Sequence, residues 1–150
     1  MKKKRLILLL LIIAWAILVF GLSGQDGGQS SGTSRKLVEF FTSNEEIIDI
    51  VEPYVRKLAH FSEYGLGGIL FTLLFATYKW SDRKVIVISI ALGIWYASID
   101  EIHQLMVDGR HGSVFDVYLD SLGFSTGVCG MLAILKIKEI LFYKRKKVKK

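Results

Sequence analysis

Four blocks of uncharged, mostly apolar residues divide the chain: Leu6–Leu22, Tyr64–Tyr78, Val85–Ile99 and Ser121–Leu135. The first block has 17 residues and each of the others has 15. A bilayer core about 30 Å thick needs about 20 helical residues, so each short block takes about five more residues from its charged flanks. We therefore predict an all-α membrane bundle with four spans, over residues 6–22, 61–80, 85–104 and 118–137.

The segments between the spans carry loop and helix signals. Gly24–Ser34 is polar and rich in glycine and serine, which predicts a flexible loop. Ser43 and Glu46 fit a capping box, and apolar residues recur at helical spacing over Ile47–Leu58. Pro53 suits the first turn of a helix and disrupts a helix interior. We therefore predict a short amphipathic helix on the outer surface, and a second helix that starts near Pro53 and continues into the second span.

The basic residues predict the orientation of the chain. They flank the first span at Lys2–Arg5, lie between the second and third spans, and fill the tail over residues 138–150. Cytoplasmic loops of membrane proteins carry an excess of Lys and Arg. Four spans with both termini in the cytoplasm satisfy this bias, because 15 of the 20 basic residues and only 2 of the 14 acidic residues then lie inside.

Composition narrows the class of protein further. The chain has 150 residues, which fits a single membrane domain, and 51% of them are hydrophobic. The four apolar blocks exclude an ordinary soluble enzyme and a disordered chain. The only cysteine, Cys129, lies within the last block, which excludes a disulfide scaffold. The net charge of +6 does not indicate nucleic-acid binding, because the basic tail is explained by topology and by contact with anionic lipid. A cleaved signal peptide is the alternative interpretation of the first span.

Ionisable residues from three predicted helices gather at one depth, at the outer edge of the hydrocarbon. A charged side chain at membrane depth costs a few kcal/mol and by default indicates a functional site. The alternative is a structural network in which Lys57 and Arg110 neutralise the carboxylates. The candidate ligand-binding residues of this outer cup are Lys57, His60, Glu63, Asp100, Glu101, His103, Gln104, Arg110, Asp116 and Asp120.

Small residues share a helix face with these charges. On the fourth span, Asp116 and Asp120 continue into Gly123, Gly127 and Gly130 at helical steps. Gly123 and Gly127 form a G-x-x-x-G motif, which allows helices to approach closely. We therefore expect these three glycines to pack against the bundle and the charged residues to face it as well.

The histidines suggest two kinds of chemistry. His60 and Glu63, like Asp100 and His103, are three residues apart and share a helix face. Such pairs suit a divalent metal ion, but spacings this short are common by chance, and we expect no metal and no cofactor. His60 or His103 also suits a general base oriented by a carboxylate.

Three motifs in this order resemble the VanZ-like family. They are K-x-A-H-F-x-E-Y at Lys57–Tyr64, D-E-x-H-Q at Asp100–Gln104, and G-R-x-G-S-x-x-D-x-x-x-D-x-x-G at Gly109–Gly123. The resemblance runs from about Trp15 to Gly130. It implies a bacterial multispan membrane protein, in a family named for a protein that accompanies glycopeptide-resistance clusters and gives low-level teicoplanin resistance. It implies no established reaction.

Two functions remain open from the sequence. In the first, the outer cup binds a membrane lipid, a lipid-linked molecule or a cell-wall precursor at the outer face, and so alters glycopeptide susceptibility. In the second, the protein is an intramembrane hydrolase or transferase that acts on a lipid-linked substrate of the outer leaflet. Its acid–base residues would come from His60, Glu63, Asp100, His103 and Asp120.

Overall fold

The computed structural model describes residues 2–24, 27–107 and 112–148, and these ranges form five helices and no strand. In chain order the helices are α1 (Lys2–Ser23), α2 (Gly27–Glu39), α3 (Glu45–Ala76), α4 (Asp82–Gln104) and α5 (Val114–Val148). All except α2 contain a stretch that is long and apolar enough to cross a membrane. The all-α class and the four predicted spans are confirmed for the described part of the chain.

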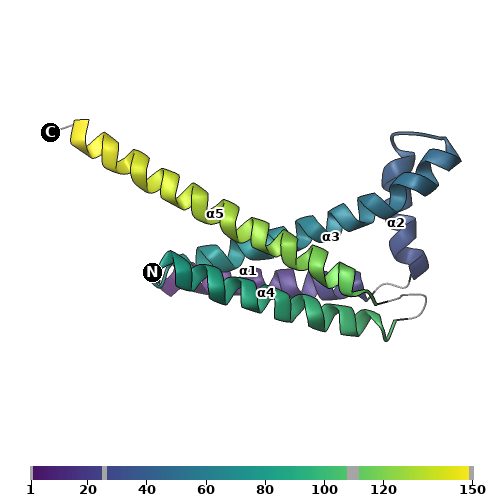
Figure 1. Ribbon diagram of the computed structural model, residues 1–150, viewed down its shortest axis with the longest axis horizontal. Coiled ribbons are helices and arrows are strands. Elements are labelled where there is room, and N and C mark those ends of the chain that lie inside the picture. Colours follow the sequence, from purple (N-terminus) through teal and green to yellow (C-terminus); the bar gives the residue numbers. More distant parts are fainter. Residues whose placement is uncertain (1, 25–26, 108–111, 149–150) are drawn as a thin grey trace.

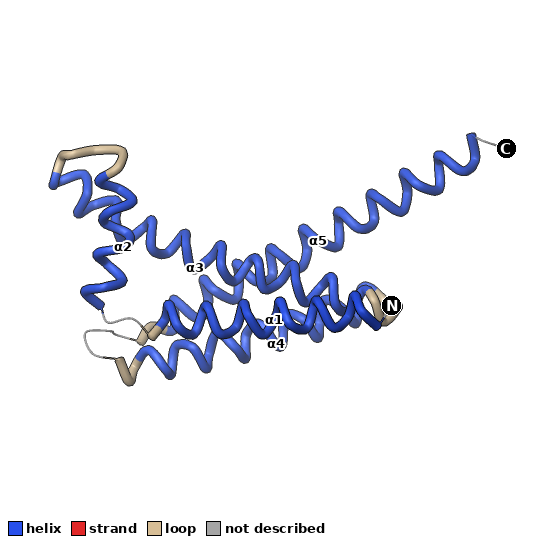
Figure 2. The backbone as a smooth tube through the Cα atoms, turned by 180° about the vertical axis from the view of Figure 1, so that it is seen from behind, coloured by secondary structure: helices blue, strands red, loops and turns tan. Residues whose placement is uncertain are grey.

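The four long helices alternate in direction, so that both ends of the chain lie on the same side of the bundle (Figure 1). As Figure 1 and Figure 2 both show, α1 and α4 lie side by side, while α3 and α5 cross and splay apart. α3 contacts every other helix and shares its largest interface with α5. Following the predicted orientation, we call the end with the C-termini of α1 and α4 the outer end, and the opposite end the inner end.

The start of α3 differs from the prediction in two respects. The helix begins after Asn44, whose side chain accepts hydrogen bonds from two backbone N–H groups of the first turn, so the predicted cap at Ser43 is wrong by one residue. The predicted break at Pro53 is also wrong, because α3 continues through this proline. A proline removes one helical hydrogen bond. The carbonyl that it frees belongs to Asp49, which is exposed, so water can satisfy it.

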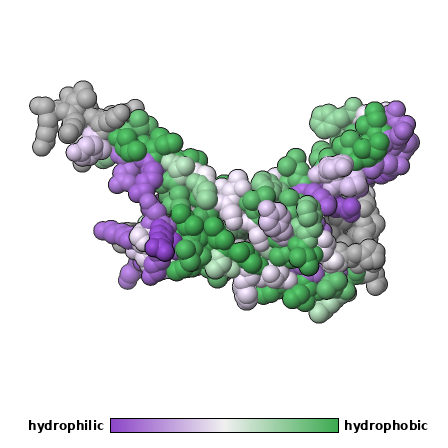
Figure 3. Space-filling model, viewed as in Figure 1, coloured by the Kyte–Doolittle hydropathy of each residue, from purple (hydrophilic) through white to green (hydrophobic). Residues whose placement is uncertain are grey.

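α2 forms where the sequence predicted a flexible loop up to Ser34. It packs along the start of α3, where Arg35 makes ion pairs with Glu39 of its own helix and with Glu45 and Asp49 of α3. The hydrogen bond to Asp49 raises the pKa of Arg35, so the guanidinium stays charged. α2 and the first turns of α3 form an outer lobe that is hydrophilic at its far edge and hydrophobic toward the middle of the molecule (Figure 3).

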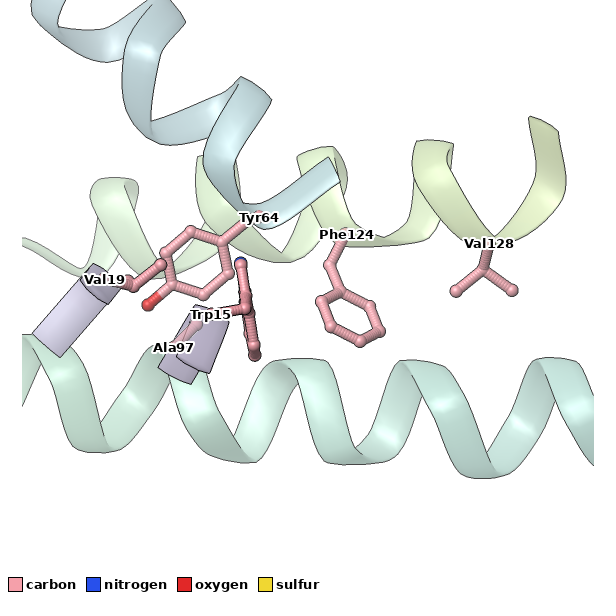
Figure 4. Close-up of a cluster of buried hydrophobic side chains, with 6 residues drawn as sticks. All are labelled: Trp15, Val19, Tyr64, Ala97, Phe124 and Val128. Atoms are coloured by element: carbon pink, nitrogen blue, oxygen red, sulfur yellow. The ribbon is translucent and has the colours of Figure 1, made fainter. Parts of the chain in front are cut away.

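Trp15 of α1 lies at the centre of the core, where it contacts the other three spans (Figure 4). Its indole N–H donates a hydrogen bond of 2.8 Å to the backbone carbonyl of Glu63 in α3. Its ring centroid lies 6.1 Å from that of Tyr64, 5.0 Å from that of Tyr96 in α4 and 6.2 Å from that of Phe124 in α5. The first span is therefore an integral part of the core, and its removal would leave a large void there.

Glycines allow the close approach of α3 and α5. A Cβ atom on Gly127 would lie 2.0 Å from the backbone oxygen of Gly65, and one on Gly123 would lie 2.3 Å from that of Phe61. The Cα–H bonds of both glycines thus point at carbonyl oxygens of α3, which is the geometry of a weak Cα–H···O contact. The prediction that Gly130 also packs against the bundle is wrong. A Cβ there would meet nothing within 4 Å.

Charged side chains join the helices at the inner end. Arg5 of α1 donates hydrogen bonds of 3.0 Å and 2.7 Å to the hydroxyl and the carbonyl of Thr77, just after α3, and its guanidinium lies 4.0 Å above the ring of Tyr78. Lys136 of α5 forms an ion pair of 2.9 Å with Asp82 at the start of α4. These inner-end contacts therefore restrain how far the long helices can slide past one another.

Candidate functional site

Three helices bring carboxyl groups together at the outer end of the bundle. Asp100 and Glu101 lie near the end of α4, Asp120 lies in the second turn of α5, and Glu63 lies in α3. The exposed fraction is 1% for Asp100, 6% for Glu101 and 2% for Asp120, whereas Glu63 is half-buried. Electrostatic interactions link Asp120 to each of the other three carboxyl groups. We call these four residues the acidic cluster.

The end of α4 positions two of these carboxylates. The side-chain amide of Gln104 donates a hydrogen bond of 3.2 Å to Asp100, one turn earlier on the same helix. Glu101 accepts a hydrogen bond from the backbone N–H of Ser113. The hydroxyl of Ser113 in turn accepts one from the backbone N–H of Phe115 in the first turn of α5. Glu101 thus ties the end of α4 to the start of α5, which holds the carboxylates of both helices in register.

Tyr64 belongs to the site, although the sequence did not single it out. Tyr64 ends the first of the three sequence motifs, directly after Glu63, and the structure turns its side chain fully inward. The tyrosine hydroxyl points away from Phe124 (Figure 4) and interacts electrostatically with Asp100 and Asp120. Its inward position could have been predicted from the two adjacent glycines, Gly67 and Gly68, that follow one turn later on the same helix and are buried in the bundle.

Several buried oxygens at this end have no hydrogen-bond partner among the residues that the structure describes. They are one carboxylate oxygen each of Asp100 and Asp120, and the hydroxyl of Ser23 at the end of α1. A buried polar group without a partner costs about 1–3 kcal/mol, and an uncompensated buried charge costs more. A bound group that donates hydrogen bonds or carries positive charge would remove this cost.

The two predicted histidines lie at the margin of the acidic cluster. His103 stacks on Phe20 of α1 with ring centroids 3.9 Å apart, and its Nδ1 atom has no hydrogen-bond partner within the described ranges. His60 is half-buried on α3. A general base in a catalytic pair is usually oriented by a hydrogen bond to its second ring nitrogen, and Nδ1 of His103 does not make one in this part of the chain. The same part contains no group of three His, Cys, Asp or Glu side chains placed to hold a metal ion.

Lys57 and Asp116 form a more exposed rim beside the acidic cluster. The Nζ atom of Lys57 lies 3.7 Å from a carboxylate oxygen of Asp116 and 4.7 Å above the ring of Phe115. Asp116 is linked electrostatically to Asp120, so the rim and the cluster adjoin. Arg110, which the sequence predicted to complete the cup, lies outside the described residues.

Comparison with known proteins agrees with the motifs of the sequence. A model of the VanZ/LLP1 family matches residues 8–137, a range that includes the acidic cluster, the rim and most of the four long helices. No curated protein and no solved structure gives a significant match to the chain. The family match thus rests on the sequence over most of the chain, and the geometry of the site rests on the present structure.

Proposed function

The chain belongs to the VanZ/LLP1 family of multi-pass membrane proteins, and on this premise we propose that it binds the polar head of a lipid-linked or cell-wall-related ligand at the outer face of the bacterial cytoplasmic membrane. The supporting observation is the acidic cluster. Asp100 and Asp120 bury oxygen atoms there that have no hydrogen-bond partner in the described part of the chain. The ligand supplies the missing donors.

The chemistry of the cluster selects the bound group. The unpartnered carboxyl oxygens can only accept hydrogen bonds, so the group in contact with them carries N–H or O–H donors. Ammonium groups and sugar hydroxyls meet this requirement, and both occur in lipid headgroups and cell-wall precursors. A phosphate does not suit the cluster itself, because it would face like charges. A phosphate instead suits Lys57, which lies at the rim of the outer cup beside the acidic cluster.

We propose further that this binding modulates susceptibility to glycopeptides such as teicoplanin. Support for this step comes from the family and from the predicted outer position of the cup. A membrane protein that holds a lipid-linked or wall-linked molecule changes how much of it is exposed to a drug outside the cell. Such a function requires no covalent step.

The test uses a deletion strain complemented with the protein, with the minimum inhibitory concentration of teicoplanin as the readout. We expect Asp100→Asn and Asp120→Asn each to abolish complementation, because the amide replaces one accepting oxygen by an N–H donor. Asp82→Asn is the matched control: it makes the same change on α4 at the inner end, where Asp82 pairs with Lys136 at the surface. Membrane abundance is checked by immunoblot. Full complementation by both cluster variants would refute the proposed function.

The histidines separate binding from the enzymatic alternative. Glutamine cannot take over the proton transfer of a catalytic base, so an enzyme would lose nearly all of the phenotype in His60→Gln or in His103→Gln. Binding through the acidic cluster predicts that both variants keep a substantial part of it.

A further inference from the structure

An apolar groove runs along the crossing of α3 and α5. Its inner part is open to the surface and has a volume of about 380 Å³, and its lining includes Gly65, Gly123 and Gly127. Its outer part, also open, has a volume of about 440 Å³ between aromatic and aliphatic side chains, with Lys57 among its lining residues. Phe61 lines both parts, so they adjoin along α3 between the rim of the outer cup and the middle of the bundle.

The inner part of the groove begins at the predicted outer edge of the hydrocarbon. Phe61 lies at this edge, and Ile69 lines the groove further along the same helix. Eight residues separate them, which is about 12 Å at 1.5 Å per residue. On α5 the lining continues to Ile134, sixteen residues from Tyr118 at the predicted outer edge, or about 24 Å. An acyl chain that enters at Phe61 from the outer leaflet therefore has room along its length.

The hydroxyl groups of the inner part of the groove are internally satisfied. The two hydroxyl-bearing residues that line it, Ser62 and Thr126, donate hydrogen bonds of 2.7 Å and 2.8 Å to backbone carbonyls of their own helices. The groove therefore offers a hydrocarbon chain an apolar wall with little polar cost. The glycines and the apolar side chains that line the groove suit a thin, flexible hydrocarbon chain.

The charges at the mouth of the groove select the headgroup. Lys57 and Asp116 lie 3.7 Å apart and are 48% and 36% exposed. This separation is longer than the 2.7–2.9 Å typical of a charge-assisted hydrogen bond, and exposed pairs of this kind contribute little stability. Each member can therefore exchange its partner for a ligand group. A headgroup with a phosphate and an ammonium satisfies both, whereas a purely anionic headgroup leaves Asp116 facing a like charge.

We propose that the groove binds one acyl chain of an outer-leaflet phospholipid of the phosphatidylethanolamine type, with its phosphate at Lys57 and its ammonium at Asp116. This inference rests on the proposed function and names the lipid class that reaches the cup. Asp116 lies one turn before Asp120 on α5 and interacts with it electrostatically. The ammonium therefore lies on the side of the headgroup nearest to the acidic cluster.

Photolabelling in vesicles tests the acyl-chain part of the proposal. The protein is reconstituted into phosphatidylglycerol vesicles that contain a trace of phosphatidylethanolamine with a diazirine in its acyl chain. Irradiation is expected to label the groove-lining peptides of α3 and α5. Gly130→Leu fills the inner groove without a clash, because a Cβ there meets nothing within 4 Å, and should lose most of the labelling. Gly21→Leu, at an equally open glycine of α1, is the matched control and should label as the parent protein does.

Two comparisons test the headgroup part. The same diazirine chain on phosphatidylglycerol is expected to label about tenfold less, which is the loss that corresponds to one charge-assisted hydrogen bond. Lys57→Gln should reduce labelling by phosphatidylethanolamine to a similar extent. Lys36→Gln, at an exposed lysine of the outer lobe, removes the same charge away from the groove and should have no effect.

Equal labelling by the two lipids, or unchanged labelling in either Gly130→Leu or Lys57→Gln, would overturn the proposal. Native mass spectrometry adds a further outcome: a dimer that Gly130→Leu disrupts, with lipid labelling unchanged, would assign the groove to a second copy of the chain. Neither Asp100 nor Asp120 lines the groove. Their effect on teicoplanin susceptibility therefore reports on the proposed function independently of this inference.

Discussion

Replacement of Gly127 by alanine is predicted to force α3 and α5 apart. The new Cβ would lie 2.0 Å from the backbone oxygen of Gly65 and 2.9 Å from its carbonyl carbon. Both are main-chain atoms within a helix and cannot move independently of it. An ordinary contact begins at 3.4 Å, so the helices must separate by about 1.4 Å. The same separation disrupts the neighbouring approaches at Gly123 and Gly68, where a Cβ would lie 2.3 Å and 2.1 Å from backbone oxygens.

We expect Gly127→Ala to lower the free energy of unfolding by about 3 kcal/mol. Overpacking of a close interface costs about 1–3 kcal/mol, and each Cα–H···O contact that lengthens loses about 0.5–1 kcal/mol. Gly130→Ala, three residues later on α5, is the control. It meets nothing within 4 Å and gains about 1 kcal/mol of helix propensity. The measurement is an SDS titration of the protein in detergent micelles, followed by tryptophan fluorescence. Equal stability of the two variants would refute the close-approach argument.

Three further predictions follow from the core, the orientation and the loop before α5. Trp15→Phe should lower the free energy of unfolding by about 1 kcal/mol or more, because it removes the hydrogen bond to the α3 backbone, and the same SDS titration measures this. A topology reporter inserted after Ser43 should lie outside the cell, and one fused after Lys150 should lie in the cytoplasm. The reverse result would contradict the predicted orientation. Arg110→Ala should abolish teicoplanin complementation and Arg110→Lys should restore it poorly, because lysine lacks the planar fork that contacts two carboxylates. Asp108→Asn should be mild, and equal loss in all three variants would contradict this reasoning.

The spans were predictable because the thickness of the bilayer, and not the tertiary packing, determines their length. The outer lobe was not predictable in this way. Its helix α2 has weak intrinsic helix propensity and is stabilised by ion pairs from Arg35 to residues of α3. Contacts between different helices cannot be predicted from the local sequence of one segment. The i,i+4 pair of Arg35 and Glu39 was the available hint. The continuity of α3 through Pro53 likewise depends on where the freed carbonyl points, and here it lies on the exposed side.

Counting residues by depth was sufficient to predict which carboxyl groups lie at the same level, and the structure brings Glu63, Asp100 and Asp120 together. The rotation of each helix was not predictable, because neighbouring positions differ by about 100° around the axis. The inward position of Tyr64 instead of Glu63 depends on Trp15, which bonds to the α3 backbone at this point and packs against the tyrosine ring. The open position of Gly130 depends in the same way on the angle at which α5 leaves α3.

The contacts of Trp15 also bear on the order in which the bundle is assembled during synthesis. α1 is made first, yet the aromatic partners of Trp15 belong to α3, α4 and α5. The indole of Trp15 in the newly made first span is therefore surrounded by lipid tails at first. Each later span then replaces part of this lipid contact with an aromatic side chain. α5 is made last, and it completes the surroundings of Trp15 and forms the largest interface of α3. The first helix is thus inserted early in translation, whereas the bundle is completed only when α5 has been made. A chain that ends before α5 would leave Gly65 and Gly68 of α3 exposed to lipid.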